Sequence, residues 1–268
     1  MAHAADIIAR FGAVEDDQRY TRLVELFTDD ATYYDPFFGA QTGKAKIQTF
    51  MEHMEEMVPA SGAYFGEWEV MAGTTVGWAK WTMYMKTPDG EKGIDGQSIY
   101  RLRDDGDGLK VCFVSDYLDS AAYRKLGRER VPEMAAPAKL SKNTTQQGSG
   151  YDVIKTFWKM QDTRQYGHLA GLFTDDAVFT DQVYGRFEGI EAITKYMQRM
   201  DTEMPEGGVT FELEDCAGDE TVGWSQWTCN VPGGSFPGWT LHTFRDGKFT
   251  LDSDYFDVAL ARKLRPKG

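Results

Sequence analysis

The stretch FTDDATYYDPFFG (Phe27–Gly39) returns later in the same chain as FTDDAVFTDQVYG (Phe173–Gly185). The two copies align at an offset of 146 residues, and the match continues to VGWAKWT at 76–82 and VGWSQWT at 222–228. Chance does not produce a match of this length. The chain is therefore predicted to be a tandem duplication of one domain of about 130 residues.

A shorter hairpin loop in the second copy interrupts the alignment, which resumes at SDYLD (115–119) and SDYFD (253–257). We expect a first domain over 1–130 and a second over 151–268. The segment between them, 131–150, is rich in Pro, Ala, Ser, Thr, Gln and Gly and is typical of a surface linker.

The bulk composition narrows the classes of partner. The 268 residues carry a net charge of -13 with a pI near 4.8, and 41% are hydrophobic. An acidic chain repels phosphate backbones and anionic lipid, so we expect neither nucleic acid nor membrane as a partner. No apolar run approaches the roughly 20 residues that span a bilayer, and no signal peptide is recognisable. Three cysteines without metal-ligand spacing indicate a cytoplasmic protein with no metal site.

Both copies show the same order of elements. Apolar residues at helical spacing predict a first helix around Ile7–Val14 and a second that carries Leu23, Leu26 and Phe27. After a short strand ending at Asp35 and a Gly-bounded turn, a third helix holds Ile47, Phe50 and Met54. Alternating aromatic and β-branched residues then predict several antiparallel strands. Helices followed by strands indicate an α+β domain, with the sheet curved over the helices.

This order and the motif DDATYYDPFFG resemble the nuclear transport factor 2-like superfamily, which includes ketosteroid isomerase and the SnoaL-like polyketide cyclases. The resemblance covers essentially the whole chain, once per copy. It implies two tandem cone-shaped α+β barrels, each with a mostly apolar pocket. Asp35 and Asp181 fall on the general-base aspartate of the isomerase. The isomerase's oxyanion-hole positions, however, are occupied by Phe11 and Ser98 in the first copy, so ketosteroid isomerisation itself is not expected.

Strand alternation predicts which side chains share a pocket with the two aspartates. In the second copy, Asp254, His242 and Asp181 would form an acid/base set, because carboxylates favour the imidazolium while burial keeps an unpaired carboxyl protonated. The first copy offers Asp35, Asp116 and Tyr100, with Tyr33 or Tyr34 nearby. The second copy is the preferred catalytic one because it alone has a histidine on the sheet. The remaining predicted contacts to substrate are Phe179, Tyr184, Ser225, Trp227, Thr240 and Phe256 in the second copy, and Tyr34, Trp81 and Ser98 in the first.

Structural interpretations stand beside these. Asp35 is also suited to a turn ahead of Pro36, and the SDY aspartates to tying the last strand to a loop. His242 is equally interpretable as a core histidine. Asp29 and Asp30 are expected at the end of the second helix or in a turn. Only one tryptophan of each pair, Trp78 with Trp81 and Trp224 with Trp227, can face the cavity.

No phosphate-binding loop and no Ser-His-Asp signature is present in the sequence, which favours chemistry without a cofactor. The preferred hypothesis is a cofactor-independent lyase for a hydrophobic aromatic molecule, by resemblance to the sphingomonad lyases that deformylate lignin-derived diarylpropanes. Alternatives are a polyketide cyclase, isomerase or epoxide-opening enzyme, or a non-catalytic ligand-binding or dimerisation module. The duplication would give an intrachain pseudo-dimer, with further association of the chain left open.

Overall fold

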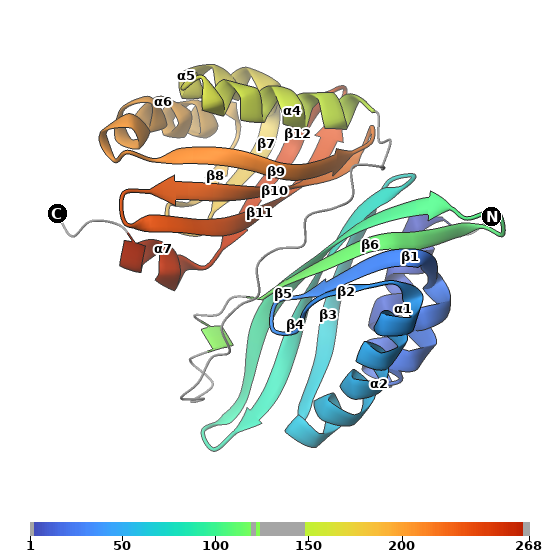
Figure 1. Ribbon diagram of the computed structural model, residues 1–268. Helices are drawn as coiled ribbons and strands as arrows, with labels where there is room; N and C mark the ends of the chain where they lie inside the picture. Colours follow the sequence, from blue (N-terminus) through green and yellow to red (C-terminus); the bar gives the residue numbers. More distant parts are fainter. Residues whose placement is uncertain (1–2, 119–121, 124–147, 265–268) are drawn as a thin grey trace. The chain divides into compact units, whose positions relative to one another are not determined.

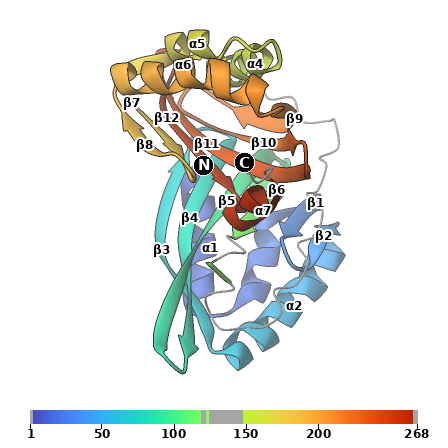
Figure 2. The same cartoon turned by 90° about the vertical axis from the view of Figure 1, so that its left-hand side faces the viewer.

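The computed structural model describes residues 3–118, 122–123 and 148–264, and the chain divides into two compact units, Met1–Leu140 and Ser141–Gly268. Most of the predicted linker lies outside the described residues, as does Asp119. In each unit a curved sheet is covered on one face by helices (Figures 1 and 2). The predicted α+β architecture in two tandem copies is confirmed.

The first domain begins with helices and continues into long strands. Its elements are α1 (Ala4–Asp16), the 3₁₀ helix η1 (Tyr20–Leu26), β1 (Phe27–Asp35), β2 (Gly39–Thr42), α2 (Lys44–Ser61), β3 (Ala63–Ala72), β4 (Val76–Thr87), β5 (Gly90–Asp104) and β6 (Leu109–Leu118). Helix α2 begins after Gly43 and ends before Gly62, both at positive φ, where glycine has no steric cost.

The second domain repeats this order and adds a short helix at its end. Its elements are α4 (Ser149–Asp162), α5 (Tyr166–Leu169), η2 (Ala170–Leu172), β7 (Phe173–Asp181), β8 (Gly185–Glu188), α6 (Ile190–Glu206), β9 (Thr210–Gly218), β10 (Val222–Val231), β11 (Gly234–Arg245), β12 (Lys248–Phe256) and α7 (Val258–Leu264).

Each sheet has six strands, in the order β2-β1-β6-β5-β4-β3 in the first domain and β8-β7-β12-β11-β10-β9 in the second. The predicted antiparallel sheet needs one correction, because the first and last long strands of each domain (β1 with β6, and β7 with β12) run parallel. This pairing brings the ends of these strands side by side, and with them Asp35 near Asp116 and Asp181 near Asp254.

Two local predictions were wrong around the expected second helix. That helix is a 3₁₀ turn in the first domain, and Phe27 already begins β1. Asp29 and Asp30 therefore lie in a strand, not at a helix end. Asp30 forms an ion pair with Arg103 on β5, and Asp176 repeats it with Arg245 on β11. These exposed pairs join the start of the first strand to the neighbouring hairpin.

The alternation of side chains along β4 and β10 follows the prediction. Trp81 and Trp227 face the helices and line cavities, whereas Trp78 and Trp224 lie on the opposite face of their sheets and are fully buried. Each inward indole lies over a glycine of the neighbouring strand. A Cβ atom added at Gly96 would fall 2.2 Å from the Trp81 ring, and one at Gly238 would fall 2.2 Å from the Trp227 ring.

We expect Gly238→Ala to displace the Trp227 indole and to lower the free energy of unfolding by about 1–3 kcal/mol, the usual cost of overpacking a core. Urea denaturation followed by tryptophan fluorescence measures both effects. Gly171→Ala is the control, because nothing lies within 4 Å of its added Cβ. Equal stability of the two variants would show that the glycine is not required beneath the indole.

Candidate active site

A cavity lies between sheet and helices in each domain. The first has a volume of about 970 Å³ and the second about 750 Å³, both measured out to the mouth. The walls are mostly aromatic rings and methionines, such as Phe179, Trp227 and Met200 in the second domain. Each cavity also contains two aspartates, Asp35 with Asp116 and Asp181 with Asp254.

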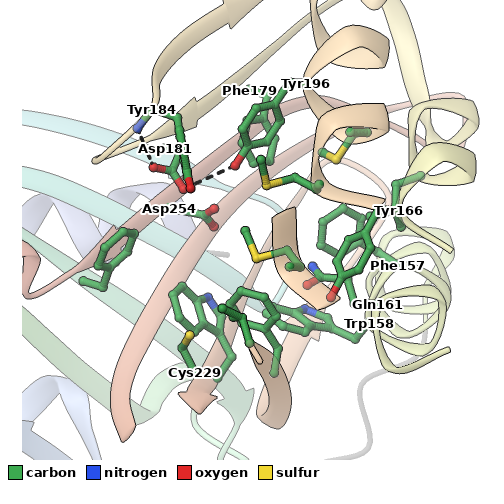
Figure 3. Close-up of a pocket in the computed structure, with 18 of the residues that line it drawn as sticks. Phe157, Trp158, Gln161, Tyr166, Phe179, Asp181, Tyr184, Tyr196, Cys229 and Asp254 are labelled. Atoms are coloured by element: carbon green, nitrogen blue, oxygen red, sulfur yellow. Dashed lines mark hydrogen bonds between the residues drawn. The ribbon is translucent and has the colours of Figure 1, made fainter. Parts of the chain in front are cut away.

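The aspartate at the end of the first strand serves the backbone as well as the cavity. Asp35 Oδ1 accepts hydrogen bonds from the backbone N–H groups of Phe37 (2.7 Å) and Phe38 (3.0 Å). Asp181 Oδ1 accepts from Val183 (2.6 Å) and Tyr184 (2.8 Å) in the same way. The turn interpretation and the pocket interpretation thus hold together, because one oxygen holds the turn while the side chain lines the cavity (Figure 3).

The aspartate on the last strand belongs to a hydrogen-bond chain that both domains share. In the first domain, Trp81 Nε1 donates to Ser98 Oγ (2.9 Å), which donates to Asp116 Oδ1 (2.6 Å). In the second, Trp227 donates to Thr240 Oγ1 (2.8 Å), which donates to Asp254 Oδ1 (2.6 Å). Because the indole can only donate, it turns the hydroxyl hydrogen toward the carboxyl group.

The two domains differ in which aspartate accepts a hydrogen bond from a tyrosine hydroxyl. Tyr33 donates to Asp116 Oδ2 at 2.5 Å, but its counterpart in the second domain is Phe179. In exchange, Phe50 of the first domain corresponds to Tyr196, whose hydroxyl lies 3.5 Å from Asp181 Oδ2 (Figure 3). In each cavity a tyrosine hydroxyl thus contacts an aspartate. It comes from strand β1 and reaches Asp116 in the first domain, whereas it comes from helix α6 and reaches Asp181 in the second.

Burial governs the protonation of these groups. It raises the pKa of Asp116 to about 7, against the hydrogen bonds from Ser98 and Tyr33 that lower it. The pKa of Asp254 is raised well above its usual range, first by burial and then by the negative charges of Asp252 and Asp181. Burial also raises the pKa of Asp35, although its two backbone hydrogen bonds oppose the shift.

His242 is the main correction to the predicted site. Its side chain faces inward from β11, as expected, but it is fully buried and does not line the cavity. Nδ1 lies 3.1 Å from Asp252 Oδ2, and Nε2 lies 3.1 Å from Ser225 Oγ. The fold thus places Ser225, His242 and Asp252 side by side, a grouping that no sequence signature revealed. Burial lowers the pKa of His242 to about 3 and raises that of Asp252, which favours uncharged forms of both.

The other predicted residues divide into two groups. Those that line a cavity are Asp35, Trp81, Ser98 and Asp116 in the first domain, and Phe179, Asp181, Tyr184, Trp227, Asp254 and Phe256 in the second. Thr240, Ser225 and Tyr100 point inward but lie behind the cavity wall, so they are not placed for direct contact with a ligand. Tyr34 is corrected outright, because it alternates with Tyr33 and Asp35 along β1 and faces the other side of the sheet.

Sequence reasoning missed several polar residues that line the second cavity. Trp158 and Tyr196 were predicted only as members of the apolar faces of the first and third helices of the second copy, and Gln161 and Tyr166 were given no role. Tyr33 could have been separated from Tyr34 by the alternation that places Asp35 inward. No comparable sequence signal marks Gln161, since its position depends on where α4 ends against the cavity.

Two further features concern residues 3–118, 122–123 and 148–264. Within these ranges, no group of three or more His, Cys, Asp and Glu side chains is placed to hold a metal ion. Within the same ranges, the helices are all too short or too polar to cross a membrane.

The amino-acid sequence matches a known domain family. The family model described as the SnoaL-like domain matches residues 8–108 and again 154–251. The chain belongs to the SnoaL-like domain family, in two tandem copies. No curated protein matches the chain.

Among solved structures, the chain is similar to an NTF2-like protein with a cystatin-like fold from Novosphingobium aromaticivorans, with 20% identity and a TM-score of 0.36 over 46% of this chain and 86% of that one. It is similar to a Catenulispora acidiphila protein with a ketosteroid isomerase-like fold, in complex with trimethylamine, with 19% identity and a TM-score of 0.37 over 43% and 94%. A putative polyketide cyclase from Sinorhizobium meliloti has 17% identity and a TM-score of 0.34 over 39% and 94%.

The raised pKa of Asp116 predicts how stability depends on pH. Between the unfolded value of 3.8 and about 7, the folded protein holds a proton that the unfolded chain releases, so this group's contribution to stability is lost as pH rises through that window. We expect Asp116→Asn to remove up to about 4 kcal/mol of that loss. Urea denaturation at pH 4.5 and 8 tests it. The control is Asp89→Asn, whose side chain is 83% exposed, and an identical pH slope in both variants would contradict the assignment.

Proposed function

We propose that the second domain is a cofactor-independent acid/base enzyme for a small aromatic molecule, with Asp181 as base and Asp254 as acid. One observation carries the proposal. Both carboxyl groups line the same aromatic cavity, yet their hydrogen-bond partners differ, two backbone N–H groups for Asp181 and one hydroxyl for Asp254. Two backbone N–H groups donate to Asp181 and stabilise its ionised form, whereas burial beside Asp252 keeps the proton on Asp254.

The hydrogen bonds favour the second domain over the first. In the first domain Ser98 and Tyr33 occupy both oxygens of Asp116, which leaves this acid engaged within the protein. In the second domain Phe179 cannot donate to Asp254, and among the described residues Thr240 is the side chain that hydrogen-bonds it. The preference for the second copy therefore stands on the Tyr33/Phe179 difference instead of on His242. We propose that the first domain binds a ligand without transforming it.

We propose carbon–carbon lyase chemistry as the reaction class, by analogy with the deformylation of lignin-derived diarylpropane diols. Asp181 would remove the proton of the hydroxymethyl group, and the bond between this carbon and the chain would break to release formaldehyde. Its electron pair would form the new C=C bond and expel the neighbouring hydroxyl, which Asp254 would protonate to water. The diol thus gives a stilbene, formaldehyde and water, and the two carboxyl groups end with exchanged proton states.

The cavity wall supports an aromatic substrate. Trp227 forms close ring pairs with Trp158, Phe211, Phe236 and Phe256, at centroid distances between 5.7 and 6.5 Å. Such a lining suits flat rings.

The test incubates the protein, treated with a chelator, with aromatic 1,3-diols that include diarylpropanes, and follows formaldehyde and stilbene absorbance. We expect Asp181→Asn and Asp254→Asn to lower kcat by at least about 100-fold, the usual contribution of an acid or base. The matched variants Asp35→Asn and Asp116→Asn should retain activity. Loss confined to the first-domain variants would move the site there, and absence of turnover on every diol would reject the reaction class.

The exchanged phenol allows a second test. Phe179→Tyr places a hydroxyl where Tyr33 reaches Asp116, so it should engage Asp254 and lower kcat by roughly 10-fold or more. Tyr33→Phe releases Asp116 in the first domain and should leave turnover unchanged. Steady-state kinetics of both variants measures this. Full activity of a folded Phe179→Tyr protein would show that an unengaged Asp254 is not required.

A further inference from the structure

The second cavity has polar groups at two separate places. Asp181, Tyr184 and Asp254 form the first group. Trp158, Gln161 and Tyr166 lie on the other side of the cavity in Figure 3, beside the first helix of the domain. Trp158 and Gln161 are three residues apart on α4 and so share one helix face, and Tyr166 begins α5 directly after it.

The indole of Trp158 is the strongest sign of a binding site in this second group. Its side chain is only 3% exposed, and among the described residues nothing accepts a hydrogen bond from Nε1. A buried donor without an acceptor costs free energy, and an oxygen on a bound ligand would remove that cost. Burial raises the pKa of Tyr166, so its hydroxyl keeps its proton and remains a donor. The Gln161 amide offers both a donor and an acceptor.

A continuous wall connects the two groups. Asp254 is hydrogen-bonded by Thr240, and Thr240 by the Trp227 indole, whose ring centroid lies 6.0 Å from that of Trp158 with an interplanar angle of 38°. The Trp227 ring thus lies between Asp254 on one side of the cavity and Trp158 on the other. An aromatic ring placed along Trp227 would have one edge toward Asp254 and the other toward Trp158.

The first domain lacks this arrangement. Gly12 occupies the position that corresponds to Trp158, and the Trp68 ring of β3 fills the space above it, 2.8 Å from where a Cβ would lie. Trp68 does not line the first cavity. The indole at this position of the cavity wall therefore belongs to the second domain, which we propose to be catalytic.

We propose that Trp158, Gln161 and Tyr166 form a distal subsite that binds an oxygen substituent, a phenolic hydroxyl above all, on the far ring of an elongated diaryl ligand. The inference rests on the proposed function for the orientation of the ligand, with its aliphatic hydroxyl groups toward Asp181 and Asp254. The indole N–H would donate a hydrogen bond to the phenolic oxygen, and the Gln161 side-chain carbonyl would accept one from the phenolic hydroxyl.

The experiment measures binding, not turnover. Two ligands are compared by calorimetry on the full chain, 1,2-diphenylethanol and 2-(4-hydroxyphenyl)-1-phenylethanol, which differ only in the distal hydroxyl. We expect the hydroxylated ligand to bind about tenfold more tightly. Trp158→Phe and Gln161→Leu should reduce this ratio to near one while the binding of 1,2-diphenylethanol stays the same. Trp68→Phe, which removes a buried indole N–H that does not line a cavity, should leave the ratio unchanged.

The outcomes separate this inference from the proposed function. Equal binding of the two ligands, or a ratio that Asp254→Asn abolishes and Trp158→Phe does not, would overturn the distal subsite even if formaldehyde is released from diols. A ratio that depends on Trp158 would establish the subsite even if no diol is turned over. Retention of folding in Trp158→Phe is checked by the unchanged affinity for 1,2-diphenylethanol.

Discussion

The hydrogen-bond chain from an indole through a hydroxyl to a buried carboxyl group fixes the sheet side of the cavity in each domain, here called the floor. It requires three neighbouring strands in one register, because Trp227 lies on β10, Thr240 on β11 and Asp254 on β12. It also requires Gly238 beneath the indole, since any side chain there would push the ring away from the hydroxyl. The first domain meets the same conditions with other residues at the hydroxyl position. A serine and a threonine serve equally, because the chain needs only one oxygen that accepts from the indole and donates to the carboxyl group.

Around this shared floor, the two domains differ in the position of the phenol that contacts an aspartate. A tyrosine on the first strand reaches the last-strand aspartate, whereas a tyrosine on the third helix reaches the first-strand aspartate. Beside the aspartates, the first cavity has Tyr33 and Phe50 where the second has Phe179 and Tyr196. The accessible chemistry does change, because the phenol decides which carboxyl group is engaged within the protein and which is left to meet a ligand.

The sequence was sufficient for the fold and for part of the site. The period of two along strands placed Trp81 and Trp227 on the inner face, and the resemblance placed Asp116 and Asp254 there. The DDAxxxD motif, which carries that resemblance, placed both turn aspartates. Alternation predicts which face of the sheet a side chain occupies, but not how far along the strand the cavity extends. His242 and Tyr100 share the inner face, yet they lie beyond the end of the cavity where the cone is filled by packing. Trp158 was out of reach for another reason, because its role depends on an unmatched indole N–H, which only the packed structure defines.

The buried Ser225–His242–Asp252 network shows how a residue away from the cavity can still shape it. The corresponding positions in the first domain are Ala79, Tyr100 and Val114, so only the second domain holds a second carboxyl group behind its floor. Asp252 and Asp254 are two residues apart on one strand and face the same side, and two carboxylates so placed in a low-dielectric interior disfavour each other's ionisation. His242 lies beside Asp252, and Ser225 lies beside His242. A purely apolar core would leave the carboxyl group and the imidazole without such polar neighbours. The raised pKa of Asp254 is thus a property of its neighbourhood, and it supports the role of acid that we propose for this residue.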